Sequence, residues 1–179
     1  MLLLLMRHGI AEELRAGQSD AARALTNEGK KKTRIAARGL RALHSNIDLI
    51  ATSPKLRAVQ TAKVAAAVFG KAEPEIWPEL ENIRHSELVS RLKTCNANSI
   101  LIVGHEPDFS NFAARLLTGR ESGFSMNFKK SGVCALEIDW STPSARATLL
   151  WHLAPSQLRM MAKDQSEKFS HHSKTSAKR

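Results

Sequence analysis

Short apolar runs alternate with longer helical stretches along this chain, and the alternation limits the folds open to it. The runs LLLLM, DLIATS and SILIVGH occupy residues 2–6, 48–53 and 99–105. Each run is short and has an uninterrupted apolar centre, as expected of a strand that is buried on both faces of a sheet. The sequence therefore predicts an α/β fold, a three-layer sandwich with a mostly parallel central sheet flanked by helices.

Capping residues mark the ends of the predicted helices. Thr26 is placed as the N-cap of a long basic helix. Pro54 is expected just inside the start of an alanine-rich helix and Gly70 just past its end. Asp108 is expected to cap a later helix that Gly119 terminates.

The length of 179 residues fits one domain with a substantial core. Two late strands are predicted over residues 132–140 and 146–153, separated by a turn. We expect the folded domain to cover residues 1–163. Residues 164–179 are polar and basic with little to bury, and are predicted to form a disordered tail.

The apolar N-terminal run does not have the features of a membrane anchor or an export signal. It is far too short to span a bilayer, no basic residue precedes it, and Arg7 interrupts it. Cys95 and Cys134 show neither a metal-ligand spacing nor a disulfide framework. We therefore expect a cytoplasmic protein without a membrane partner, a metal or another cofactor.

The formal net charge of +10 raises the question of nucleic-acid binding. However, aromatic residues are not interleaved with the basic clusters, and the chain contains no Tyr. Stacking on bases is therefore poorly provided for. We do not expect nucleic acid as the partner, and interpret the basic surface as one that attracts anionic substrates.

Arginines and histidines follow three of the apolar runs where each predicted strand ends. The segments are MRHG, TSPKLRAVQTA and VGHEPDFS, which contain Arg7, His8, Arg57 and His105. The carboxyl ends of parallel strands meet at one edge of a sheet, where ligands bind. Guanidinium groups grip phosphate, and a neutral imidazole is a nucleophile toward phosphorus. The combination predicts metal-independent phosphoryl transfer through a phosphohistidine, although each residue alone could be a turn histidine or a surface charge.

These segments resemble the motifs of the histidine phosphatase (phosphoglycerate mutase-like) superfamily. RHG, SPKLRAVQTA and VGHEP occur in the order and at the spacing of that family. The short length, together with WPEL, GHEPDFSNFAARLLTG, FKKSGVCALEID and LLWHLAPSQLR, is similar to the small bacterial SixA-type phosphohistidine phosphatases. The resemblance covers about residues 1–160.

The resemblance implies a role for each residue of the predicted site. His8 would be the nucleophile that becomes phosphorylated, with the backbone of Gly9 a plausible partner for its other ring nitrogen. Arg7 and Arg57 would hold the phosphoryl oxygens and stabilise charge in the transition state. His105 would bind the transferring group from the opposite side.

Two glycines and two glutamates complete the candidate site. Gly9 and Gly104 have no side chain, which would let the backbone approach the phosphate. Larger superfamily members use a glutamate as general acid, which the SixA-type proteins are regarded as lacking. Glu81, or else Glu79, is the candidate for that role here, and the alternative for both is a surface carboxylate.

The resemblance implies a phosphatase that hydrolyses phosphohistidine on a partner protein, such as a phosphotransfer domain. Loss of a neutral imidazole needs little acid assistance, whereas an ester alkoxide does need an acid. A working Glu81 or Glu79 would therefore favour a small phosphomonoester as substrate. A non-catalytic phosphate-binding module is the remaining alternative.

Overall fold

The computed structural model describes residues 1–120, 126–141 and 145–162. The predicted tail, residues 164–179, and most of the predicted turn between the two late strands lie outside the described residues. The strands are β1 (Leu2–Arg7), β2 (Leu49–Thr52), β3 (Glu75–Ile76), β4 (Ser99–Gly104), β5 (Val133–Asp139) and β6 (Arg146–Leu153). The α-helices are α1 (Asn27–Leu43), α2 (Leu56–Phe69), α3 (His85–Thr94) and α4 (Asp108–Thr118). Two 3₁₀ turns, η1 (Asp20–Ala22) and η2 (Pro78–Leu80), and a helix over 155–162 complete these elements.

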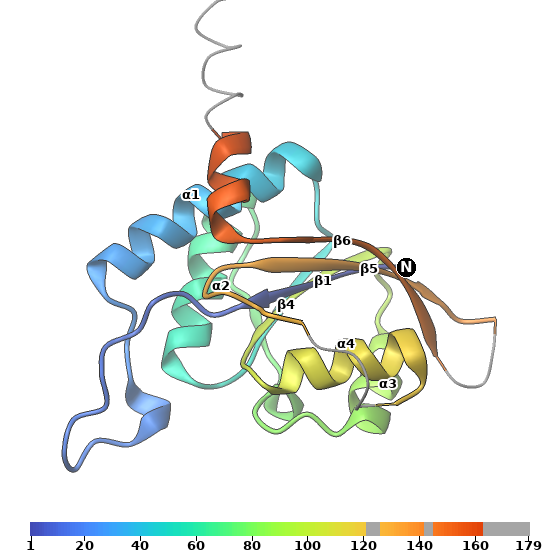
Figure 1. Cartoon of the computed structure of the whole chain (residues 1–179), viewed down its shortest axis with the longest axis horizontal. Coiled ribbons are helices and arrows are strands. Elements are labelled where there is room, and N and C mark those ends of the chain that lie inside the picture. The colour runs from blue at the N-terminus through green and yellow to red at the C-terminus, as the bar shows by residue number, and fades with distance from the viewer. Residues whose placement is uncertain (121–125, 142–144, 163–179) are drawn as a thin grey trace, which may run out of the picture.

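One mixed sheet runs through the molecule in the order β3-β2-β4-β1-β5-β6 (Figure 1). The pairs β2–β3, β2–β4 and β1–β4 are parallel, whereas β5 is antiparallel to both β1 and β6. Strands β1 and β4 lie in the middle of the sheet and are buried almost throughout. The predicted α/β fold with a mostly parallel central sheet is therefore confirmed.

Helices cover both faces of the sheet, as the alternation of side chains along β1 requires. Leu4 and Met6 point into a core formed with α1, α2 and Leu158. Leu3 and Leu5 point into the other core, formed with α3 and α4. Because each face is covered, β1 can be apolar at every position until it reaches the edge of the sheet.

Most of the predicted helix ends are confirmed. The Thr26 hydroxyl accepts a hydrogen bond from Gly29 N–H, 2.9 Å away, at the start of α1. Gly70 follows α2 with a φ of 65°, a left-handed conformation that glycine adopts without strain. Gly119 ends α4 in the same way, with a φ of 78°.

Two predicted helix starts are wrong. Pro54 lies ahead of α2, because the next residue, Lys55, is still extended (φ −63°, ψ 131°) and forms the N-cap. Asp108 lies within the first turn of α4, where its carboxylate faces the positive end of the helix dipole but makes no cap hydrogen bond. Glu106 takes that role, since its carboxylate accepts from Ser110 N–H at 3.1 Å.

Candidate active site

The ends of β1 and β4 bring the two predicted catalytic histidines together. Arg7 and Gly104 are register partners in the parallel pair, and His8 N–H donates to the Gly104 carbonyl at 3.0 Å. His8 and His105 therefore follow neighbouring strands at the same edge. Their ring centroids are 5.2 Å apart, and both side chains are buried.

Two hydrogen bonds fix the tautomer of His8. Its Nδ1–H donates to the carbonyl oxygen of Gly9 at 2.7 Å, which is the partner that the sequence predicted. The Nε–H of Arg57 donates to His8 Nε2 at 3.3 Å. An atom that accepts a hydrogen bond has a free lone pair, so Nε2 is the unprotonated nitrogen.

The surroundings of His8 keep its ring neutral. Burial is the largest cause that lowers the pKa of His8, and together with the positive charges of Arg57, Arg7 and Lys130 it brings the pKa to about 4, against the Gly9 hydrogen bond, which raises it. A pKa of about 4 leaves the imidazole uncharged at neutral pH. The unprotonated Nε2 is thus available as a nucleophile.

Arg57 lies in the first turn of α2, which the end of β1 holds in place. Thr61 accepts a hydrogen bond from Gly9 N–H at 3.0 Å and donates to the Arg57 carbonyl at 2.7 Å. The Arg57 side chain is buried, and its Nη1 and Nη2 donate to the main-chain carbonyl and carboxylate of Asp20 at 2.7 and 2.9 Å. Its guanidinium therefore bridges His8 and the loop that contains Asp20.

Asp20 is a residue of this site that sequence reasoning missed. Its carboxylate also accepts from Arg23 at 2.9 Å and lies 3.7 Å from Lys55 Nζ. Hydrogen bonds from Arg23 and Arg57 lower the pKa of Asp20 to about 2. No signal in the polar stretch before α1 distinguishes Asp20, because its partners are set by the fold and not by local spacing.

His105 has one ring nitrogen engaged and one without a partner. Its Nε2 lies 2.9 Å from the Ser53 hydroxyl, and that oxygen accepts from Lys55 N–H at 3.4 Å. The Ser53 hydroxyl can donate to Nε2, and in that arrangement the proton of the neutral ring lies on Nδ1. Burial above all, followed by the charges of His8 and Arg57, lowers the pKa of His105 to about 3. Its Nδ1 is buried and has no partner among the described residues.

Arg7 completes the charged set at the end of β1. Its Nη1 donates to the Phe128 carbonyl at 2.6 Å, which fixes the guanidinium against the segment before β5. Its Nε is buried without a hydrogen-bond partner among the described residues. The positive charge of Arg7 also acts on His8, as the lowered pKa of that histidine shows. The four residues predicted for catalysis are thus brought to one edge of the sheet.

Packing accounts for the two glycines of the predicted site. A Cβ on Gly9 would lie 2.4 Å from the Thr33 hydroxyl, and one on Gly104 would lie 2.6 Å from the Phe109 ring. Both distances are too short for a side chain. These glycines let α1 and α4 pack closely beneath the histidines, and their contact with a phosphate stays a prediction.

The candidate general acids form no hydrogen bond or ion pair with the predicted catalytic residues in the part of the chain that the structure describes. Glu79 forms an ion pair with Arg91 at 3.8 Å. Glu79 and Glu81 both line a cavity whose other lining residues are Pro78, Asn82, Arg84 and Glu87. No residue of the Arg7–His8 edge lines that cavity, and no described contact joins either glutamate to His8. A role for Glu79 or Glu81 as general acid stays a prediction.

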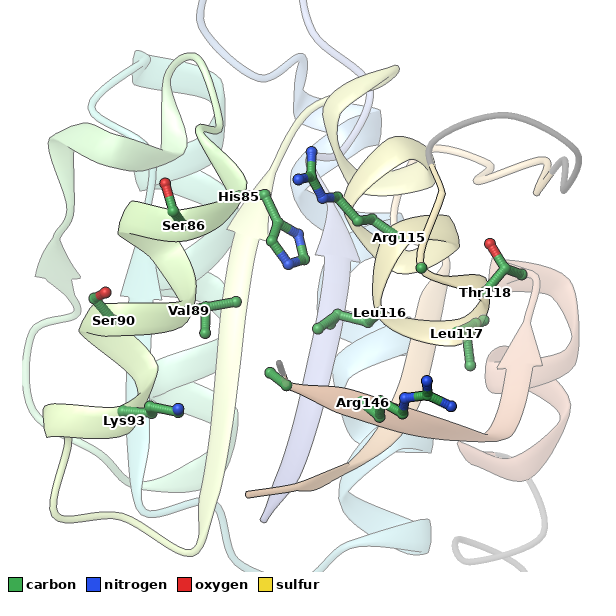
Figure 2. A pocket seen from close by; sticks show the side chains of 12 residues that line it. His85, Ser86, Val89, Ser90, Lys93, Arg115, Leu116, Leu117, Thr118 and Arg146 are labelled. Atoms are coloured by element: carbon green, nitrogen blue, oxygen red, sulfur yellow. The ribbon is translucent and has the colours of Figure 1, made fainter. Parts of the chain in front are cut away.

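Another cavity, of about 520 Å³, separates α3 from α4 (Figure 2). His85 and Arg115 face each other across it, and Arg146 at the start of β6 lines its far side. None of the predicted site residues lines it. Within the part of the chain that the structure describes, no cluster of His, Cys, Asp and Glu could hold a metal ion, and no helix is long and apolar enough to cross a membrane.

Comparisons with known proteins give the family of this chain. Residues 3–91 match the model of the histidine phosphatase superfamily, branch 1. The phosphohistidine phosphatase SixA of Escherichia coli is 30% identical over 165 residues, which cover 89% of this chain and 98% of that protein. An uncharacterized protein of Picosynechococcus is 33% identical over 141 residues, covering 76% of this chain and 84% of its own.

The fold agrees with a solved structure of the protein histidine phosphatase SixA complexed with tungstate. The TM-score is 0.77 at 26% identity, and the match covers 88% of this chain and 99% of that one. The relatives and the shared fold together identify the family. This chain belongs to the histidine phosphatase superfamily, branch 1, and is homologous to the phosphohistidine phosphatase SixA.

Proposed function

We propose that this protein is a cytoplasmic phosphatase that hydrolyses phosphohistidine on a partner protein through a covalent intermediate on His8. The observation that carries the proposal is the state of His8. Its Nδ1–H donates a hydrogen bond to the Gly9 carbonyl, and its Nε2 is unprotonated. The positive charges of Arg57 and Arg7 lie close to the ring. A residue that only bound phosphate would not need an unprotonated imidazole in this position.

The first chemical step transfers the phosphoryl group to the enzyme. His8 Nε2 attacks phosphorus while the bond from phosphorus to the substrate imidazole nitrogen breaks, and that imidazole leaves with a proton from solvent. Arg57 Nε–H, which donates to His8 Nε2 in the unliganded site, turns to a phosphoryl oxygen as the new bond forms. The Nε of Arg7 and the Nδ1–H of His105 are further donors for the oxygens.

The second step regenerates the enzyme. Water attacks the phosphorus of phosphorylated His8, the bond from phosphorus to Nε2 breaks, and inorganic phosphate leaves. The hydrogen bond from Nδ1–H to Gly9 keeps the ring in its orientation throughout, because it does not involve the reacting nitrogen. In both steps the leaving group is an imidazole, which departs without strong acid assistance.

The positions of the two glutamates support phosphohistidine over a phosphate ester as the substrate. An ester alkoxide requires a proton donor within hydrogen-bond reach of the leaving oxygen. Glu79 pairs with Arg91, and both Glu79 and Glu81 line a cavity that none of the predicted catalytic residues lines. The similarity to the phosphohistidine phosphatase SixA also supports phosphohistidine as the substrate.

The test compares two substrates and three variants. Wild type, His8→Ala, Glu81→Gln and the control Glu87→Gln are assayed on a phosphohistidine-bearing phosphotransfer domain and on an aryl phosphate. Glu87 is the matched control because it lines the same cavity as Glu81. We expect phosphohistidine turnover to be lost only in His8→Ala.

Other outcomes select the alternatives. A preference for the aryl phosphate that Glu81→Gln abolishes, with Glu87→Gln active, would make this a small-molecule phosphatase with Glu81 as its acid. No turnover of either substrate by folded wild type would indicate a phosphate-binding module.

A further inference from the structure

A third cavity is lined by Arg7, which also belongs to the candidate active site. It has a volume of about 480 Å³, and its charged lining residues are Arg7, Lys32, Lys129, Lys130 and Arg159, with no acidic side chain among its lining residues. We name it the basic cavity. These positive charges repel one another, and an anion in the cavity would be attracted to all of them and would reduce that repulsion.

The backbone of the active site holds the turn that carries two of these lysines. Ser131 N–H donates to the carbonyls of Arg7 and His8 at 3.0 and 3.2 Å. Ser131 itself has a φ of 65°, a left-handed conformation that a non-glycine residue keeps only when its contacts impose it. Lys129 and Lys130, which precede it, are therefore fixed at the wall of the catalytic site.

The other two walls are fixed by close packing. Thr33 on α1 and Ser131 share a buried hydrogen bond of 2.9 Å between their hydroxyls, which places the neighbouring Lys32 beside the turn. A Cβ on Gly39 would lie only 1.8 Å from the Leu158 carbonyl, so α1 lies directly against the helix over 155–162. Arg159 follows Leu158 in that helix. The cavity is thus a built feature of three packed elements.

At least one charge of the basic cavity acts on His8. The charge of Lys130 contributes to the lowered pKa of His8, so the two groups lie within electrostatic range of each other. Of the cavity's cations, Lys32 is paired with Glu28, and the side chain of that glutamate is largely exposed. The buried Nε of Arg7 is unpartnered among the described residues. A ligand that spans both spaces would meet Arg7 between them.

We propose that the basic cavity binds a second anionic group, a carboxylate or a phosphate, of the substrate whose phosphoryl group is transferred to His8. The inference rests on the proposed function and names its substrate class. On a protein substrate the group is an acidic side chain beside the phosphohistidine, and on a small substrate it is a second phosphate. Either group would accept charge-assisted hydrogen bonds from Lys129, Lys130 and Arg159.

The experiment measures a ratio, which cancels losses from reduced folding. Wild type, Lys129→Gln, Arg159→Gln and the control Lys31→Gln are assayed on two phosphohistidine peptides, one flanked by Asp and Glu and one by Asn and Gln. Lys31 is the matched control because it is exposed on α1 next to Lys32 and does not line the cavity. The readout is kcat/KM on the acidic peptide divided by kcat/KM on the neutral one.

We expect wild type to favour the acidic peptide by about tenfold, mainly through KM, as one or two charge-assisted hydrogen bonds would produce. Lys129→Gln and Arg159→Gln should each reduce the ratio by roughly threefold or more, and Lys31→Gln should leave it unchanged. Equal turnover of the two peptides by wild type would overturn the inference while the proposed function stands. An acidic preference that survives both cavity variants would also overturn it.

A failure of the proposed function would look different. Folded wild type would then hydrolyse neither peptide. In that case kcat/KM would be measured for a small ester with two phosphates and divided by kcat/KM for an ester with a single phosphate. A preference for the doubly phosphorylated ester that Arg159→Gln removes would support the basic cavity with a small substrate. No such preference would overturn it.

Discussion

At His8, the choice of ring nitrogen follows from what the two neighbouring residues can offer. A backbone carbonyl can only accept, so Gly9 holds the proton on Nδ1, and a guanidinium can only donate, so Arg57 keeps Nε2 unprotonated. Both partners come from rigid elements, one from the end of β1 and one from the first turn of α2. These two hydrogen bonds hold the His8 ring in one orientation and one tautomer.

This arrangement predicts an unusual titration for His8. Its ring should stay neutral down to about pH 4, because burial, opposed by the Gly9 hydrogen bond, and nearby cations lower its pKa to about 4. Imidazole ¹⁵N chemical shifts across a pH series measure this directly, with His8→Gln identifying the signal. We expect the Nδ1-protonated tautomer at neutral pH. A signal that titrates at or above the ordinary value of about 6.5 would contradict the electrostatic account.

Asp20 provides a second prediction at the residue scale. Asp20→Asn removes the charge that faces Arg57 but keeps the main-chain carbonyl that accepts from its Nη1. We expect kcat/KM to fall by about threefold to tenfold, because the loss of one charge-assisted hydrogen bond loosens the guanidinium. The control is Asp139→Asn, whose carboxylate accepts hydrogen bonds from Ser141 at the end of β5. Equal losses in both variants would show that Asp20 does not position Arg57.

At the scale of elements, α1 determines how closely the helix over 155–162 approaches the sheet. Two glycines of α1 lie against the backbone of neighbouring segments. A Cβ on Gly29, near the start of α1, would lie 2.1 Å from the Ile10 carbonyl. A Cβ on Gly39, near its end, would lie 1.8 Å from the Leu158 carbonyl. These contacts leave no room for a methyl group. Thr33, between them, reaches Ser131 beside the active site.

Gly39→Ala tests this packing, because two effects of opposite sign compete. Helix propensity alone would stabilise the protein by about 1 kcal/mol. The clash with the Leu158 carbonyl should outweigh it, and we expect a net loss of about 1 to 3 kcal/mol in the free energy of unfolding by urea. Lys31→Ala, at an exposed position of α1, is the control and should change stability by less than about 0.5 kcal/mol. A stabilised Gly39→Ala protein would mean that the two helices separate freely.

Comparison of predicted and observed elements shows what local patterns can reveal. Buried strands and the helix ends at Thr26 and Gly70 are encoded by apolar runs and capping residues, and they were predictable. The convergence of His8, Arg57 and His105 was predictable as well, because the ends of parallel strands meet at one edge.

Contacts between distant segments were not predictable in the same way. Asp20 lies in a polar loop without periodicity, and its approach to Arg57 depends on the path of that loop across the sheet edge. The turn before β5 reaches Arg7 and His8 only because β5 pairs antiparallel with β1. No local signal in the sequence encodes that pairing.

For the molecule as a whole, the positive charge and the buried histidines act in opposite directions on pH tolerance. The formal net charge of the chain is +10 at neutral pH, which favours the approach of anions in general. It also means that every further proton is added to an already cationic molecule. The two active-site histidines resist protonation most strongly, with pKa values of about 4 and about 3.

Acid should therefore destabilise the fold through these two side chains. An unfolded histidine takes up its proton near pH 6.5, whereas folded His8 and His105 do so only near pH 4 and 3. Between these limits the unfolded state binds more protons, so stability falls as the pH falls, by up to about 1.4 kcal/mol per pH unit for each histidine. Asp20, whose pKa is about 2 in the folded protein, adds to this loss only below about pH 5, where the unfolded carboxyl begins to take up a proton and the folded one stays ionised.

The measurement is the free energy of unfolding by urea at about pH 6.5 and about pH 4.5 in wild type, His8→Gln and His105→Gln. Each variant lacks one of the two groups, so each should lose less stability than wild type over this interval. A variant less stable than wild type at pH 6.5 still tests the prediction, because only the difference between the two pH values enters. An unchanged difference in both variants would place the acid sensitivity elsewhere in the molecule, and would mean that burial does not hold these imidazoles neutral.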